Sequence, residues 1–215
     1  MDTKRGSYLL SRAKIVIFLL LIATSGNSQT PTADAGLDRL AEAANAISTN
    51  QLQHAEELLN SVLATSPNDA DALNLLGVVR AKQNRIADAE RLFRRAISSL
   101  PSHVGAHINL AEFLISHDRS AEAMPVLLRA YKLAPSRPEI NLNLAMLYIA
   151  KSNYAEAYEH LRLISQEALD DRYFVLMLRS LVGLKRTQEL RELVTQFRQV
   201  NSGTQRHRRS LQRYC

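Results

Sequence analysis

The sequence predicts an all-α fold that is built from repeated pairs of helices, and three observations support this prediction. Similar segments recur every 34 residues along the 215-residue chain. Within each segment, the apolar residues follow the spacing of one helix face. The chain contains only seven Gly and six Pro, too few for an all-β protein with many tight turns. A fixed period of roughly 20 to 50 residues is typical of a stacked repeat array.

The repeat is clearest in three segments that end in proline, 53–67, 87–101 and 121–135, which read QHAEELLNSVLATSP, ADAERLFRRAISSLP and AEAMPVLLRAYKLAP. Each has Ala in third place and a bulky apolar residue in seventh place. A second set of segments lies upstream at the same 34-residue step: 72–83, 106–117 and 140–151. Because both sets show helical spacing, each unit is predicted to contain two helices.

Small side chains mark the places where two helices are predicted to approach closely. They are Gly77, Ala111 and Ala145 in the first helices, and Ala89, Ala123 and Ala157 in the second helices. Larger residues are predicted to fill the space between neighbouring units: Phe93, Leu127 and Leu161. The stretches QNR, HDRS and KSN between the helices predict turns, because Asn and Asp tolerate the left-handed backbone region. Proline ends each unit since it cannot continue a helix.

This pattern resembles the tetratricopeptide repeat, a helix–turn–helix unit whose pattern is W-x₂-L-G-x₂-Y, then A-x₃-F, then P. The resemblance covers roughly residues 36–200 and implies an all-α, right-handed superhelical solenoid of antiparallel helix pairs. About five units are expected, near 36–69, 70–103, 104–137, 138–171 and 172–200. The fifth unit fits only if one residue is deleted from its turn, and it has Leu190 in place of the small Ala.

Residues 1–28 are predicted to form a signal peptide. Four basic residues precede the apolar run Ile15 to Ala23, and small residues then allow cleavage after Ser25 or Ser28. The alternative is an uncleaved N-terminal anchor, although this run is shorter than the roughly 20 residues of a membrane-spanning helix. In both cases the repeats are expected to lie outside the cytoplasm. A cleaved signal peptide would leave them in the periplasm or secreted, whereas an uncleaved anchor would make the protein single-pass membrane-anchored. Residues 29–35 are predicted to form a linker.

The net charge of +6 comes from the two ends of the chain. Residues 1–28 carry +3 and residues 198–215 carry +5, which leaves −2 for the part between them. A nucleic-acid-binding protein would carry a basic face on its folded part, so no nucleic-acid partner is predicted. Residues 201–215 are predicted to be a basic, disordered tail that ends at Cys215, the one cysteine of the chain.

The sequence contains no recognisable catalytic constellation, and no cofactor or metal is expected. His103 and His107 are four residues apart, but a third ligand is lacking and His103 precedes the start of the helix. His54, His117 and His160 are predicted to be solvated residues of helix faces or turns.

The resemblance also implies that the first helices of the units line a concave groove that binds a polypeptide segment. Mapped onto this chain, the groove residues are Asn74, Lys82, Asn109, Glu112, Asn143, Met146 and Ile149. Asn109 and Asn143 are one period apart, and a carboxamide can both donate to and accept from a peptide unit. The alternative is that these Asn side chains cap local backbone. The chaperone version of the groove, which grips a C-terminal carboxylate, is rejected because Val78 and Glu139 replace the basic residues that it needs.

The sequence therefore predicts an exported, non-catalytic binding module or scaffold for a protein or peptide partner. Membrane contact is expected only through the N-terminal segment, if that segment is uncleaved. Two alternatives stay open: a membrane-anchored scaffold and the accessory region of a longer enzyme. RNA-binding helical repeats are less well supported, because the repeat region is slightly acidic.

Overall fold

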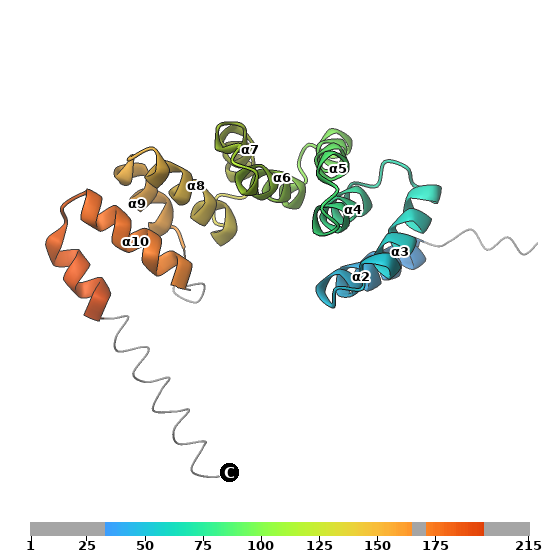
Figure 1. Cartoon of the computed structure of the whole chain (residues 1–215), viewed down its shortest axis with the longest axis horizontal. Helices are drawn as coiled ribbons and strands as arrows, with labels where there is room; N and C mark the ends of the chain where they lie inside the picture. Colours follow the sequence, from blue (N-terminus) through green and yellow to red (C-terminus); the bar gives the residue numbers. More distant parts are fainter. Residues whose placement is uncertain (1–32, 165–170, 196–215) are drawn as a thin grey trace, which may run out of the picture.

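The computed structural model describes residues 33–164 and 171–195 (Figure 1). The predicted signal peptide and basic tail lie outside these residues. The described helices, in chain order, are α2 (Ala33–Ser48), α3 (Leu52–Thr65), α4 (Ala70–Lys82), α5 (Ile86–Ser99), α6 (Val104–Ser116), α7 (Ser120–Leu133), α8 (Pro138–Ala150), α9 (Tyr154–Arg162) and α10 (Asp171–Gly183). A last helical segment follows at 187–195. Among the described residues, the first helix, α2, begins inside the predicted linker, three residues before the expected first unit.

Helices that are adjacent in the chain pack against each other as antiparallel pairs. The pairs α2–α3, α4–α5, α6–α7 and α8–α9 form successive units, and each unit also contacts the next. All regular secondary structure within 33–164 and 171–195 is helical. The predicted fold class, an all-α right-handed superhelical solenoid of antiparallel helix pairs, is confirmed. None of the helices in the described part has the length and apolar character that a membrane crossing requires.

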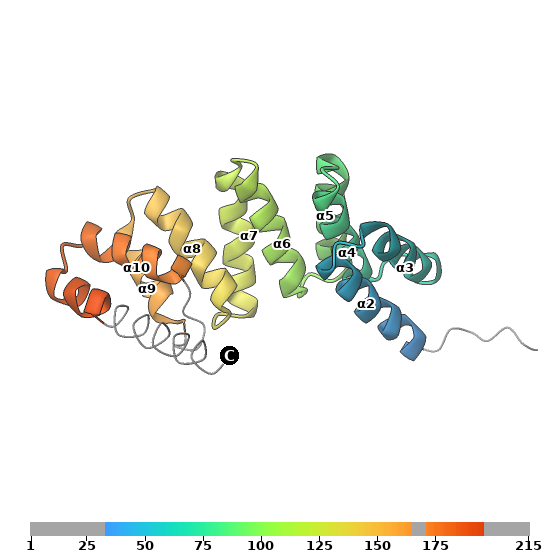
Figure 2. The same ribbon diagram turned by 60° about the horizontal axis from the view of Figure 1, so that its bottom comes forward.

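The units are arranged as an arch (Figure 1). In this view α4 and α6 lie on the inner side of the bend, whereas α5 and α7 lie on its outer side. Figure 2 shows the α4–α5 and α6–α7 pairs standing next to each other along the chain of units. The first helices of the units therefore line the concave side, and the second helices form the convex side.

The small residues predicted at the close approaches are buried in the structure. Ala89, Ala123 and Ala157 are fully buried, as are Ala111 and Ala145. The apolar residues form three successive clusters along the array, so that each unit buries its faces against its neighbours. In the fifth unit Leu190 is half-buried against the third cluster and occupies the place of the small Ala.

The turns inside the units place one residue each in the left-handed region. These residues are Asn50, Asn84, Asp118, Ser152 and Lys185, with φ between 58° and 61°. The step between them is 34 residues until Ser152, after which it is 33. The deletion that was predicted in the turn of the fifth unit is wrong, because α10 already ends 33 residues after α8 and three residues separate the helices in both turns. In the stretch KSN the left-handed residue is Ser152, whereas Asn153 precedes α9 with φ −92°. The tolerance of Asn for the left-handed region therefore does not identify which residue of this turn adopts it.

Candidate functional site

The predicted groove residues lie on α4, α6 and α8, but their exposure differs widely. Asn74, Asn143 and Ile149 are buried, with Asn143 only 1% exposed. Asn109 and Met146 are half-buried, whereas Lys82 and Glu112 are exposed. The neighbouring units cover the side chain of Asn143, so it is not open to solvent as Lys82 and Glu112 are.

The amides are bonded to side chains of neighbouring units. Asn109 Nδ2 donates to Asn74 Oδ1 at 2.9 Å, which joins α6 to α4. Asn143 Nδ2 donates to Glu112 Oε1 at 2.9 Å, and Asn143 Oδ1 accepts a hydrogen bond from Arg172 on α10. We call these residues the amide ladder: Asn74, Asn109, Glu112, Asn143 and Arg172. In this arrangement the bonds of Asn109 and Asn143 join units, and neither amide caps local backbone.

A hollow of about 390 Å³ lies between the C-terminal ends of α4 and α6. We call it the groove hollow. Its lining residues come from both first helices, the turn after α6 and the core: Val78, Ala81, Lys82, Phe93, Asn109, Glu112, Phe113, Ser116 and His117. Three predicted groove residues, Lys82, Asn109 and Glu112, are therefore brought together around one cavity. Asn143, Met146 and Ile149 on α8 do not line it.

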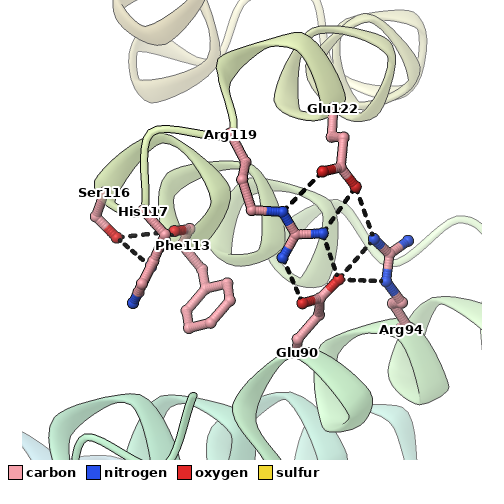
Figure 3. Close-up of polar contacts among 7 residues, drawn as sticks. All are labelled: Glu90, Arg94, Phe113, Ser116, His117, Arg119 and Glu122. Carbon is pink, nitrogen blue, oxygen red and sulfur yellow. Dashed lines mark hydrogen bonds and ion pairs between the residues drawn. The ribbon is translucent and has the colours of Figure 1, made fainter. Parts of the chain in front are cut away.

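Aromatic rings form part of the wall of the groove hollow. The rings of Phe93 and Phe113 lie 5.9 Å apart, and the ring of His117 lies 4.3 Å from that of Phe113. His117 Nδ1 bonds the Phe113 carbonyl at 2.7 Å, and the Ser116 hydroxyl donates to the same oxygen (Figure 3). Sequence reasoning missed Phe113 and His117, because the family pattern assigns the groove to other helix positions. The wall combines apolar rings with an exposed cation and an exposed carboxylate at the rim.

His103 and His107, which have the four-residue spacing of a helical metal pair, bond to separate partners. The backbone N–H of Ala106 donates to His103 Nδ1 at 3.0 Å, so that His103 caps α6, and His103 Nε2 lies 3.0 Å from Asp71 Oδ1. His107 Nε2 lies 3.0 Å from the Pro101 carbonyl oxygen. Within the part of the chain that the structure describes, no group of three or more His, Cys, Asp or Glu residues is arranged to hold a metal.

His160 is not the solvated residue that the sequence predicted. Its ring stacks on Tyr148 and lies edge-on to Tyr131, with ring centroids 5.5 Å and 4.9 Å away. Its Nδ1 lies 2.9 Å from Asn141 Oδ1, so the Nδ1–H donates to this oxygen. Burial lowers the pKa of His160. Tyr148 lies on α8 and Tyr131 lies on α7. The periodicity of the sequence does not predict that these two rings contact His160.

An ion-pair network joins the second helices of two neighbouring units (Figure 3). Arg119 at the start of α7 bonds Glu90 on α5 at 2.6 Å and Glu122 on its own helix at 2.7 Å. Arg94 also bonds Glu90, at 2.7 Å. The hydrogen bond from Arg119, with a smaller contribution from Arg94, lowers the pKa of Glu90 to about 2. The two guanidinium groups of this network pair with its two carboxylates. This pairing indicates that the network holds the two units together.

Solved structures with this fold include several tetratricopeptide repeat proteins. PilF of Pseudomonas aeruginosa matches with a TM-score of 0.69 and 19% identity over 93% of this chain and 90% of that chain. MamA matches with a TM-score of 0.60 and 17% identity over 74% of this chain and 88% of that chain. An O-GlcNAc transferase of Thermobaculum terrenum matches with a TM-score of 0.55 and 23% identity, over 61% of this chain and 27% of that chain. Identities of this size show a shared fold.

No curated protein gives a significant sequence match. Two family models, each described as tetratricopeptide repeat, match the sequence itself. One matches residues 40–103 and 79–138, and the other matches residues 117–181. Together they span most of the described helices, with the same period that the left-handed turn residues follow. The chain belongs to the tetratricopeptide repeat family.

Proposed function

We propose that the protein is a non-catalytic scaffold that binds a polypeptide segment of a partner in its concave groove. Tetratricopeptide repeats generally mediate protein–protein interactions. The observation that carries the proposal for this chain is the groove hollow. It lies between two first helices, and Lys82, Asn109 and Glu112 surround it.

The lining of the groove hollow defines the chemistry of the segment that it would bind. Val78 and the rings of Phe93 and Phe113 offer an apolar wall, which suits one apolar side chain of the segment. Lys82 and Glu112 are exposed at the rim, and they would pair with charges that flank this side chain. Asn109 keeps its Oδ1 for a backbone N–H of the segment, because its bond to Asn74 uses one N–H of its amide.

A site-specific photo-crosslinker in the full-length protein tests where the partner lies. Ser116 is exposed at the edge of the groove hollow, and its hydroxyl bonds only the local backbone and the adjacent His117, so a crosslinker at this position disturbs little. Arg91 is the matched control, because it is an exposed residue of α5, the helix that lies on the convex side. We expect a defined adduct in cells from position 116 and none from position 91. An adduct from position 91 alone would contradict groove binding.

Affinity measurements with the cross-linked partner then test the chemistry. Ser116→Phe should fill the groove hollow, and Lys82→Ala should remove its exposed cation. We expect each change to weaken binding by five-fold or more, which corresponds to about 1 kcal/mol. Arg91→Ala should leave the affinity unchanged, and all three variants should keep their melting temperatures. Normal binding by both groove variants would disprove the proposal.

We also propose that the repeats act outside the cytoplasm, after export through residues 1–28. The support is the short apolar run behind four basic residues. Mass spectrometry of the protein from its own host tests this proposal, and we expect a mature chain that starts near Gly26 or Gln29. An intact Met1 in the membrane fraction would instead favour the membrane-anchored scaffold.

A further inference from the structure

A second hollow of about 440 Å³ lies between α5, α6 and α7, on the side of the second helices. We call it the outer hollow. Ile97, Leu110 and Val126 give it an apolar lining, and Arg94 and Arg129 contribute guanidinium groups. It shares no lining residue with the groove hollow.

His107 lines the outer hollow and is only 5% exposed. Its Nε2 lies 3.0 Å from the Pro101 carbonyl oxygen, which can only accept, so Nε2 carries the proton. In this tautomer Nδ1 is an acceptor. It is buried, and no described residue donates to it. A buried polar atom without a partner is costly, so such an atom calls for a specific explanation.

The equivalent position in the next unit has the same arrangement, but there both polar groups of the side chain are hydrogen-bonded. Asn141 lies one period after His107, and its Nδ2 donates to the Pro135 carbonyl as His107 donates to Pro101. The remaining acceptor, Asn141 Oδ1, receives a hydrogen bond from the ring of His160 at 2.9 Å. That ring lies edge-on to Tyr131.

Neither ring has an aromatic counterpart beside His107. The residue one period before His160 is Val126, and the residue one period before Tyr131 is Ile97. Both line the outer hollow. The hollow therefore occupies the place that the rings of Tyr131 and His160 fill one period later, and the unused acceptor nitrogen of His107 corresponds to the oxygen that the His160 ring satisfies.

We infer that the outer hollow binds a tyrosine side chain of a partner polypeptide, with an acidic residue beside the tyrosine. The phenol ring fills the space between Ile97 and Val126, and its O–H donates to His107 Nδ1. Tyrosine keeps this proton at neutral pH, since its ordinary pKa is about 10. The neighbouring carboxylate pairs with Arg129, an exposed cation that has no ion pair among the described residues, whereas Arg94 is already bonded to Glu90.

Three short peptides test this site on the full-length protein. The probe is acetyl-Ala-Asp-Tyr-Asp-Ala-amide, and its two controls replace Tyr by Phe or both Asp residues by Lys. Binding is measured by NMR titration of the backbone amides. We expect the tyrosine peptide to shift the signals of Ile97, His107 and Val126, and to bind at least five-fold more tightly than either control. No binding of the tyrosine peptide at millimolar concentration, or equal binding of all three, would overturn the proposal.

Variants copied from the neighbouring units test the contacts. His107→Asn introduces the residue found at the equivalent position of the fourth unit, Asn141, and keeps a hydrogen-bond acceptor. His107→Leu introduces the residue of the second unit, Leu73, and removes the acceptor. We expect Asn to retain binding of the tyrosine peptide and Leu to weaken it about five-fold. Equal binding by the two variants would mean that Nδ1 is merely hydrated, and the proposal would be wrong.

Val126→His copies the ring of His160 into the third unit. We expect it to fill the outer hollow, to raise the melting temperature and to abolish peptide binding. Retained binding in this variant would place the peptide elsewhere and contradict the proposal. Binding of the groove partner should be unaffected, so failure of this inference is distinguishable from failure of the proposed function.

Discussion

Glu90 Oε2 and Arg119 Nη1 lie 2.6 Å apart and join the second helices of two successive units, α5 and α7. Another ion pair joins the preceding two units, because Arg80 on the first helix α4 bonds both carboxylate oxygens of Glu56 on α3. These hydrogen bonds lower the pKa of Glu90 and of Glu56 to about 2 in each case. Both pairs cross a boundary between units, so they stabilise the stacking of the array.

Stability should therefore fall in acid. A carboxylate whose pKa is lowered in the folded state stabilises that state at pH values above its ordinary pKa of 4.5. This contribution to stability is lost as the pH falls from about 4.5 to 2. We expect a loss of about 1–2 kcal/mol for each carboxylate, after allowance for partial solvent exposure. Urea unfolding of wild type and Glu90→Gln between pH 6 and pH 3 measures it, with the exposed Glu57→Gln as control. An unchanged pH dependence in Glu90→Gln would contradict this prediction.

Gly77 and Phe93 form a matched pair at the close approach of α4 and α5. A Cβ at position 77 would lie 2.6 Å from Phe93 Cε1, closer than side-chain atoms pack. The next two units have Ala and Leu at the equivalent positions. We therefore expect Gly77→Ala to cost about 1–3 kcal/mol alone, and to be neutral or stabilising in the Phe93→Leu background, where Ala is also the better helix former. Additive effects in this double-mutant cycle would show that the ring adjusts freely.

Ser152 is strained by its left-handed backbone, with φ 58°. The equivalent residue is Asn or Asp in the three preceding units, and these residues tolerate the left-handed region better. Ser152→Asn should stabilise the protein by about 0.5–1 kcal/mol, which raises the melting temperature by about 1–4 °C. The control is Ser102→Asn, in an exposed turn position where φ is not positive. A lower melting temperature for Ser152→Asn alone would disprove the assignment of strain.

Asn74 and Asn109 should affect the stability of the protein mainly as a hydrogen-bonded pair. Asn109→Leu leaves the oxygen of the buried Asn74 without its donor, so we expect a cost of about 1–2 kcal/mol. Adding Asn74→Leu should recover most of this loss, because both polar partners are then absent. Leu already occurs at equivalent positions of other units: Leu75 lies one period before Asn109, and Leu142 lies two periods after Asn74. Thermal unfolding of the single and double variants checks this, and a double variant less stable than Asn109→Leu would contradict it.

The sequence by itself determined the all-α class, the two-helix unit and its period. These properties follow from local patterns: helical spacing, small residues such as Ala89 and Ala123, turn residues such as Asn84, and proline at unit ends. The period also indicated that the fifth unit is one residue short, although the turn that contains Lys185 has the same length as the turn before α9. Three of the proposed groove residues, Lys82, Asn109 and Glu112, lie around one hollow as the shared helix face implies.

Only the tertiary structure decided which side chains pair between units. The same period places Asn109 and Asn143 alike, yet Asn109 bonds Asn74 on the preceding unit whereas Asn143 bonds Glu112 and Arg172 on both sides. The burial of His160 against Tyr131 and Tyr148, and the unpaired Nδ1 of His107, likewise depend on residues from several helices. The physical reason is that a periodic pattern sets the face on which a side chain lies, whereas its partner depends on how far each unit is rotated and displaced relative to the next.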